Sequence, residues 1–154
     1  MKNVKNLSVL FILTLITSSV YTQGSRDLTG TTVDANAFRF EGENHTTVRL
    51  SVNIVSPDLN YADGVRFDFG SSNTILDAFV ETDMGIDPAV MIQGSEVMFG
   101  DSSNGIFNGD GIFLYDMSYD FVVHLDGQVA SPLDIEFIVY DDGWAQDYCI
   151  NDNN

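Results

Sequence analysis

The stretch Thr46–Val55, TTVRLSVNIV, alternates apolar and polar residues over most of its length. Its even-numbered residues from Val48 to Ile54 are aliphatic, and the odd-numbered residues between them are polar or charged. Since successive side chains of a strand point to opposite faces, this stretch predicts a half-buried β-strand. The turn residues Ser56-Pro57-Asp58 follow it and predict where the strand ends.

The same period of two recurs along the chain. It places Leu76, Ala78 and Val80 on one buried face and starts a later buried row at Met117. Turn signals separate these stretches, and no convincing helical stripe follows residue 22, so we predict an all-β, antiparallel sandwich of the immunoglobulin or fibronectin type III kind with about seven strands. The expected strands cover residues 31–40, 46–55, 64–69, 74–82, 89–93, 96–99, 117–125 and 132–140.

Residues 1–22 have the features of a helical, cleavable signal peptide. Lys2 and Lys5 precede the apolar run Val9–Ile16, and cleavage is expected after Thr22. The run is shorter than the roughly 20 residues of a membrane span, so we expect no membrane span after cleavage. Residues 23–154 then form a single domain that is secreted or held at the cell surface, or periplasmic if no sorting domain follows.

The charge of the chain limits its partners. The 154 residues include 23 Asp and Glu against 6 Lys and Arg, a net charge of −17. Both lysines lie in the predicted signal, so the net charge of the exported part is −19. A nucleic-acid ligand needs Lys and Arg to neutralise its phosphates, so nucleic acid is excluded as a partner, as is an anionic membrane surface.

Known catalytic motifs are absent from the sequence, which contains no G-x-S-x-G, H-E-x-x-H, P-loop or G-x-G-x-x-G pattern. His45 and His124 are expected to be solvated side chains. Asp134 and Glu136 share one face of an expected strand, about 7 Å apart, which suits a glycosidase pair. Exposed acids at alternate positions more often keep a sheet soluble and protect its edge. The sequence therefore predicts a protein that is not an enzyme.

Acidic, Gly- and Asn-rich stretches suggest that Ca²⁺ is bound, because this hard cation prefers oxygen ligands. The alternative is that these stretches are ordinary turns between strands, which need no metal. The candidate calcium ligands are Asp101, Asn108 and Asp110 in one stretch and Asp141 and Asp142 in another.

Aromatic residues near the second acidic stretch suggest a sugar site. Trp144, with Tyr140 and Tyr148 close by in sequence, offers rings that stack on a sugar beside carboxylates that bind its hydroxyl groups. The alternative is that Trp144 caps the core of the sandwich. Cys149 is an odd cysteine in an exported chain, which suggests a missing partner or a free thiol. Either the chain ends in a frayed polar tail, or the sequence is a fragment that lacks its last strand and the second cysteine; the second interpretation is adopted.

The start of the chain, MKNVKNLSVLFILTLITSSVYTQ, resembles that of exported Bacteroidetes proteins. The immunoglobulin-like modules of their large secreted proteins are similar to two later runs, TTVRLSVNIVSPDLNYADGVRFDFGSS with the following ILDAFVETD, and FVVHLDGQVASPLDIEFIVYDDGW. The resemblance covers most of residues 40–144. It implies export associated with the type IX secretion system and a function in adhesion, spacing or ligand binding. The chain departs from these proteins in lacking the final strand and a sorting domain.

Together these features predict a non-catalytic, exported β-sandwich module for extracellular or cell-surface interaction or adhesion, with a protein or a glycan as partner. The alternative is a carbohydrate-binding module that uses exposed aromatic residues. A third hypothesis is a glycan hydrolase with Asp134 and Glu136 as its acids.

Overall fold

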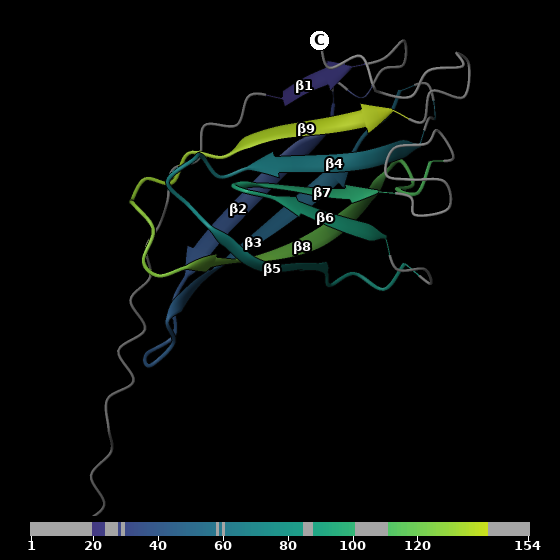
Figure 1. Ribbon diagram of the computed structural model, residues 1–154. Coiled ribbons are helices and arrows are strands. Elements are labelled where there is room, and N and C mark those ends of the chain that lie inside the picture. The colour runs from purple at the N-terminus through teal and green to yellow at the C-terminus, as the bar shows by residue number, and fades with distance from the viewer. Residues whose placement is uncertain are drawn as a thin grey trace, which may run out of the picture.

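The chain folds as a two-layer β-sandwich in the computed structural model (Figure 1). The structure describes residues 20–23, 28, 30–57, 59, 61–84, 88–100 and 111–141, and only the backbone of 20–23 and 141. Among these residues no helix has the length and apolar character needed to cross a membrane. The strands are β1 (Val20–Gln23), β2 (Thr32–Phe38), β3 (His45–Ile54), β4 (Ala62–Asp68), β5 (Ile75–Val80), β6 (Ala89–Gln93), β7 (Glu96–Gly100), β8 (Met117–Asp126) and β9 (Glu136–Asp141).

The strands form two sheets that are antiparallel apart from one edge. The first has the order β2-β3-β8-β5, and the second has the order β9-β4-β7-β6. At the edge of the second sheet β1 pairs in parallel with β9. The predicted all-β antiparallel sandwich is thus confirmed. β1 includes the position of the expected cleavage after Thr22, and the signal peptide stays a prediction.

The first sheet follows the A-B-E-D order of immunoglobulin domains, with β2, β3, β8 and β5 in those places. The second sheet differs, because the hairpin β6–β7 lies between β5 and β8 in the chain and adds two strands beside β4. The immunoglobulin-like assignment therefore stays a prediction.

Three details of the predicted strands are wrong. Leu76 was expected to be buried but is 53% exposed, because a bulge between Ile75 and Asp77 shifts the register and Ile75 is buried instead. Met117 was also expected to be buried, but it begins β8 and is exposed. β9 begins at Glu136, four residues later than expected, and the skipped stretch includes Pro132, which has no N–H for a sheet hydrogen bond.

The core lies between the two sheets and is centred on aromatic rings. Phe67 of β4 stacks on Phe137 of β9 with centroids 5.4 Å apart, and packs edge-to-face on Phe121 of β8 at 5.5 Å. Phe99 of β7 lies 4.7 Å from Phe121, and all four side chains are fully buried. Such contacts join strands from both sheets, so the fold depends on them.

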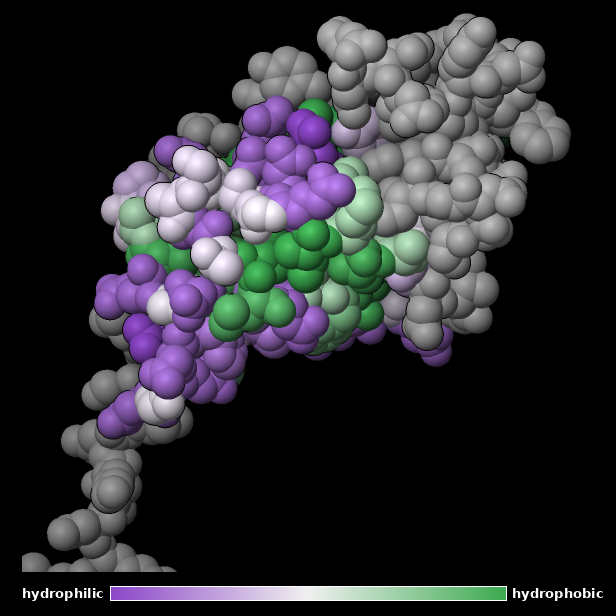
Figure 2. Space-filling model, in the orientation of Figure 1, coloured by the Kyte–Doolittle hydropathy of each residue, from purple (hydrophilic) through white to green (hydrophobic). Residues whose placement is uncertain are grey.

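One side of the sandwich presents apolar residues to solvent. β5 and β6 are edge strands of different sheets and contact each other on this side. Figure 2 shows apolar surface in this region. Leu76 of β5 and Val90 and Ile92 of β6 are exposed, and we call these three residues the edge patch.

We expect Phe67→Ala to lower the free energy of unfolding by about 3–5 kcal/mol, because it leaves a cavity among the four rings. Phe67→Leu, which keeps an apolar side chain there, should cost less. Urea denaturation followed by circular dichroism measures both. Phe40→Ala, at an exposed position, is the control and should stay within about 0.5 kcal/mol of the wild type. A similar small effect of Phe67→Ala would contradict this account of the core.

Candidate functional site

Of the three aromatic residues predicted to bind a sugar, the structure describes one. Tyr140 lies in β9 and is fully buried, so its ring has no exposed face. Trp144 and Tyr148 lie outside the described residues. Tyr140 therefore cannot stack on a sugar in this structure, whereas stacking by Trp144 and Tyr148 stays a prediction.

The candidate calcium ligands are mostly outside the described residues as well. This holds for Asp101, Asn108, Asp110 and Asp142. Asp141 ends β9, where its backbone pairs with Ala62 of β4. Among the residues that the structure describes, no group of three or more His, Cys, Asp or Glu side chains is arranged to hold a metal ion.

The start of β4 contacts Asp141 and the residues that follow the other predicted calcium stretch in the sequence. Ala62 pairs with Asp141, and its carbonyl accepts hydrogen bonds from the N–H groups of Ile112 and Phe113 at 3.0 and 2.9 Å. The N–H of Gly111, which follows Asp110 in sequence, donates to Oδ1 of the fully buried Asp63 at 3.3 Å. Sequence analysis missed Asp63, which lies at a bulge in β4.

The acids considered for hydrolysis, Asp134 and Glu136, are both exposed. Glu136 begins β9, and its carboxylate lies 3.7 Å from the guanidinium of Arg66, which also lies 3.7 Å from Glu96. Asp134 precedes the strand. The structure thus places Glu136 in an ion-pair network on the outer face of the second sheet.

Two tyrosines that sequence analysis did not single out are in contact at the end of the sandwich where β4 begins. Tyr61 precedes β4 and Tyr115 precedes β8, and their ring centroids lie 5.7 Å apart at an angle of 59°. Tyr61 is 38% exposed. We call this pair the tyrosine platform. Three residues close to these tyrosines in the sequence also have exposed apolar side chains, namely Leu59, Leu114 and Met117.

The backbone beside the tyrosine platform is held in an uncommon conformation. Leu59 and Asp116 have φ angles of 63° and 54°, in the left-handed region that non-glycine residues seldom adopt. The N–H of Leu59 donates to the carbonyl of Ser56 at 3.1 Å, and that of Asp116 donates to the carbonyl of Ile54 at 2.7 Å. Strain of this kind persists only where surrounding contacts maintain it, and it is concentrated at functional sites.

Tyr119 of β8 anchors the loop that carries Tyr115. Its hydroxyl accepts a hydrogen bond from the N–H of Leu114 at 2.7 Å, and its buried ring packs edge-to-face on Phe113 at 5.1 Å. Burial raises the pKa of the Tyr119 hydroxyl, and the hydrogen bond with the Leu114 backbone opposes part of this shift. Tyr119 therefore joins the core to the tyrosine platform.

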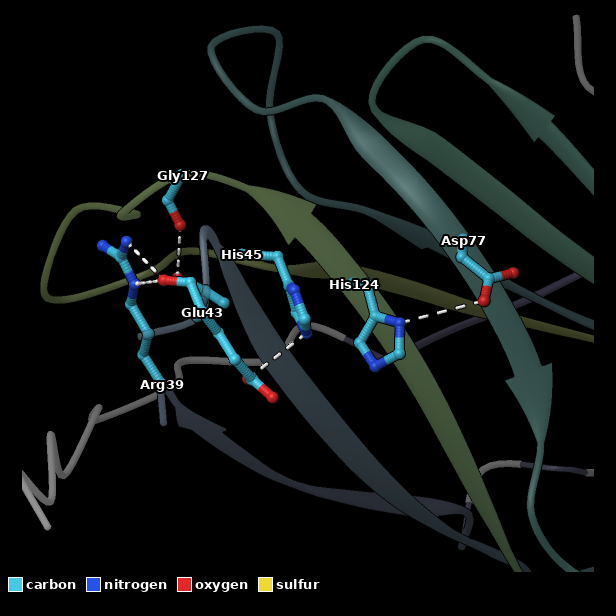
Figure 3. Close-up of polar contacts among 7 residues, drawn as sticks. Arg39, Glu43, His45, Asp77, His124 and Gly127 are labelled. Carbon is cyan, nitrogen blue, oxygen red and sulfur yellow. Dashed lines mark hydrogen bonds and ion pairs between the residues drawn. The ribbon is translucent and has the colours of Figure 1, made fainter. Parts of the chain in front are cut away.

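A second cluster of polar side chains lies on the outer face of the first sheet. His45 of β3 and His124 of β8 are in ring contact, with centroids 4.6 Å apart. Figure 3 shows Glu43 beside His45 and Asp77 beside His124. Sequence analysis expected two separate solvated histidines, because nothing in the sequence states which strands pair or in which register.

No known protein family matches the chain, and no curated protein shows a significant match. Solved structures of chitin-binding domains match the chain at low identity, with TM-scores below 0.5. The crystal structure of the chitin-binding domain of a chitinase from Pyrococcus furiosus has 12% identity and a TM-score of 0.44, covering 78% of this chain and 97% of that one. Its solution structure gives 12% identity, a TM-score of 0.41, and coverage of 78% and 91%. The chitin-binding domain of Chi18aC from Streptomyces coelicolor has 13% identity, a TM-score of 0.43, and coverage of 68% and 89%.

The raised pKa of Tyr119 predicts a loss of stability in alkali. Because this pKa is higher in the folded chain than in the unfolded one, the contribution of the neutral phenol is complete below the ordinary tyrosine pKa and disappears as the pH rises through the raised pKa. We expect the free energy of unfolding to fall above about pH 10, and Tyr119→Phe to remove part of that fall while costing about 1 kcal/mol at neutral pH. Urea denaturation between neutral and alkaline pH tests this. An equal alkaline fall in both proteins would contradict it.

The predicted calcium site has a direct test. If Asp141 contributes to it, the melting temperature should be higher in about 1 mM Ca²⁺ than in excess EDTA. Asp141→Asn should reduce this difference, and Asp126→Asn, an exposed position at the other end of the sandwich, should leave it unchanged. Equal melting temperatures of the wild type in Ca²⁺ and EDTA would refute the calcium site.

Proposed function

We propose that this chain is a non-catalytic carbohydrate-binding module of an exported protein, and that a sugar ring packs on the tyrosine platform. The observation that carries the proposal is the contact between two accessible tyrosine rings, Tyr61 and Tyr115, at one end of the sandwich. This is the function that sequence analysis kept as the alternative, but at different residues.

The chemistry of the tyrosine platform suits a sugar. A tyrosine offers an apolar ring face for the C–H groups of a pyranose and a hydroxyl that both donates and accepts hydrogen bonds. Other polar groups lie on the neighbouring strand ends: Asp116 is exposed, and the hydroxyl of Ser118 donates to Oδ1 of Asn53 at 3.2 Å. Ligand sites typically combine an apolar lining with a few polar groups of this kind.

The tyrosine platform is also fixed before any ligand arrives. Its two loops are held by the hydrogen bonds of Leu59 and Asp116 to the chain at the end of β3, and by the hydroxyl of Tyr119. Binding then costs little additional ordering, which matters for a small, weakly bound sugar surface.

The charge of the chain narrows the class of glycan. A net charge of −17 repels polyanions, so an uncharged polysaccharide is favoured over a sulfated or uronic-acid-rich one. Such ligands are consistent with the predicted secretion or cell-surface location of the chain.

A protein-interaction or adhesion module of the immunoglobulin-like kind is the second candidate function. The edge patch favours it, because exposed apolar residues gathered on one side of a domain are typical of protein contacts. This function and glycan binding use different surfaces, so substitutions at the tyrosine platform distinguish them.

We expect the wild-type protein to bind one or more insoluble polysaccharides from a panel of chitin, cellulose, xylan and starch, measured by depletion from solution. Tyr61→Ala should weaken this binding by about tenfold or more, because a stacking face is removed. Phe40→Ala is the matched control, since it removes an exposed aromatic ring at the opposite end of β3.

Equal losses with Tyr61→Ala and Phe40→Ala would place the glycan elsewhere than on the tyrosine platform. Absence of binding to the whole panel and to soluble oligosaccharides would refute the carbohydrate function and favour the protein-interaction module. Circular dichroism of each variant establishes that a loss is not due to unfolding.

A further inference from the structure

The outer face of the first sheet brings the two histidines of the chain together. β3 and β8 pair so that Thr47 lies opposite His124 and His45 lies opposite Asp126, which makes His45 and His124 diagonal neighbours on one face. Their ring centroids are 4.6 Å apart and their planes are inclined by 56°. The two rings are therefore tilted relative to each other and do not stack in parallel.

Each imidazole has a carboxylate beside one of its nitrogens. Nε2 of His45 lies 3.4 Å from Oε2 of Glu43, and Nδ1 of His124 lies 3.8 Å from Oδ2 of Asp77. Figure 3 shows the four side chains next to one another across the sheet, in the order Glu43, His45, His124 and Asp77. A metal-binding histidine commonly has a carboxylate at one ring nitrogen and binds the metal through the other.

The environment of Glu43 also calls for a positive charge. Its Oε2 is shielded from solvent and accepts no hydrogen bond among the described residues, and Nε2 of His45 lies 3.4 Å from it. The guanidinium of Arg39 does not neutralise it, because Nε and Nη2 donate to the backbone carbonyl of Glu43 at 2.8 and 2.7 Å. A cation held by the imidazole would supply charge near this oxygen.

The distance between the two ring centroids matches that of two imidazoles bound to one metal ion at a right angle. A metal–nitrogen bond of about 2.0 Å puts a ring centroid about 3.2 Å from the ion, so two imidazoles at a right angle have centroids about 4.5 Å apart. The observed separation is 4.6 Å. Right angles between nitrogen ligands are typical of tetragonal Cu²⁺, whereas tetrahedral Zn²⁺ opens the angle and separates the rings further.

The surrounding chain keeps the pair in place. The Thr46 hydroxyl donates to the carbonyl of Gly127 at 2.8 Å, and the N–H of Gly127 donates to the carbonyl of Asn44 at 2.8 Å, which ties the start of β3 to the end of β8. Phe79 packs edge-to-face on the other side of His124, with centroids 6.0 Å apart. Both histidines remain partly exposed, so an ion can reach them from solvent.

We propose that His45 and His124 form a two-nitrogen site for a divalent transition-metal ion, Cu²⁺ in the first place, with Glu43 and Asp77 as the outer carboxylates that orient the two rings. Solvent completes the coordination. The ion would join β3 to β8 on the face of the sheet and is distinct from the predicted calcium site at the tyrosine end.

The test is a titration of the tag-free protein with CuCl₂, followed by isothermal calorimetry and by electron paramagnetic resonance. We expect one Cu²⁺ with nitrogen in its coordination sphere. His45→Gln and His124→Gln should each weaken binding by about tenfold or more, since either one destroys the chelate. The double variant should be little worse than either single variant, because the two residues act as one unit.

Two controls keep the result unambiguous. Asp77→Asn leaves both imidazoles in place and should weaken binding less than removal of a ring, whereas Asp134→Asn, an exposed position just before β9 of the second sheet, should have no effect. Because the chain contains only these two histidines, Cu²⁺ bound elsewhere by carboxylates would show oxygen coordination. A wild-type spectrum with oxygen ligands alone, or unchanged affinity in both histidine variants, would overturn the proposal.

Discussion

The pairing of β3 with β8 is the constraint on which the rest of the structure depends. The two strands pair over all ten residues of each, in the middle of the first sheet. One face of this pair sends Leu50 and Phe121 into the core, and the other face carries His45 and His124. Because side chains alternate along a strand, a slip of one residue would expose the core face and bury the polar one. Burial therefore fixes the register, and the register fixes the position of every side chain on the outer face.

The same register determines what meets at each end of the sandwich. Ile54 pairs with Met117, so the end of β3 and the start of β8 lie side by side. The loops that carry Tyr61 and Tyr115 therefore converge. At the other end the hydrogen bonds from Thr46 to Gly127 and from Gly127 to Asn44 close the sheet beside the histidines. The pairing of β3 with β8 thus places one proposed site at each end of the sandwich. Both sites are supported by regular structure more than by the loops themselves.

Sequence alone predicted the strands well, because each is a local pattern of alternating residues; β6 was predicted to the residue. Where prediction failed, the cause was not local. The burial of Ile75 in place of Leu76 comes from a bulge opposite β8, and nothing in the stretch itself indicates it. The histidine pair and the tyrosine platform each join residues far apart in the chain, so they required the strand order and register. The aromatic cluster sought near Trp144 was inferred from neighbours in sequence, whereas the pair that the structure brings together shares no segment.

The acidity of the chain affects the proposed metal site and has little effect on the tyrosine platform. A net charge of −17 makes a negative field that concentrates cations at the surface. Glu43 and Asp77 flank the two imidazoles, so this field also raises the concentration of metal ions near the imidazole nitrogens. A neutral sugar is indifferent to that field, and its affinity depends on stacking and hydrogen bonds at short range. Salt should therefore weaken the long-range attraction of a metal ion to the histidines and leave contacts on the tyrosine platform nearly unchanged. The three arginines that the structure describes do not reverse this difference, since Arg49 and Arg66 are paired with glutamates and Arg39 donates to a backbone carbonyl.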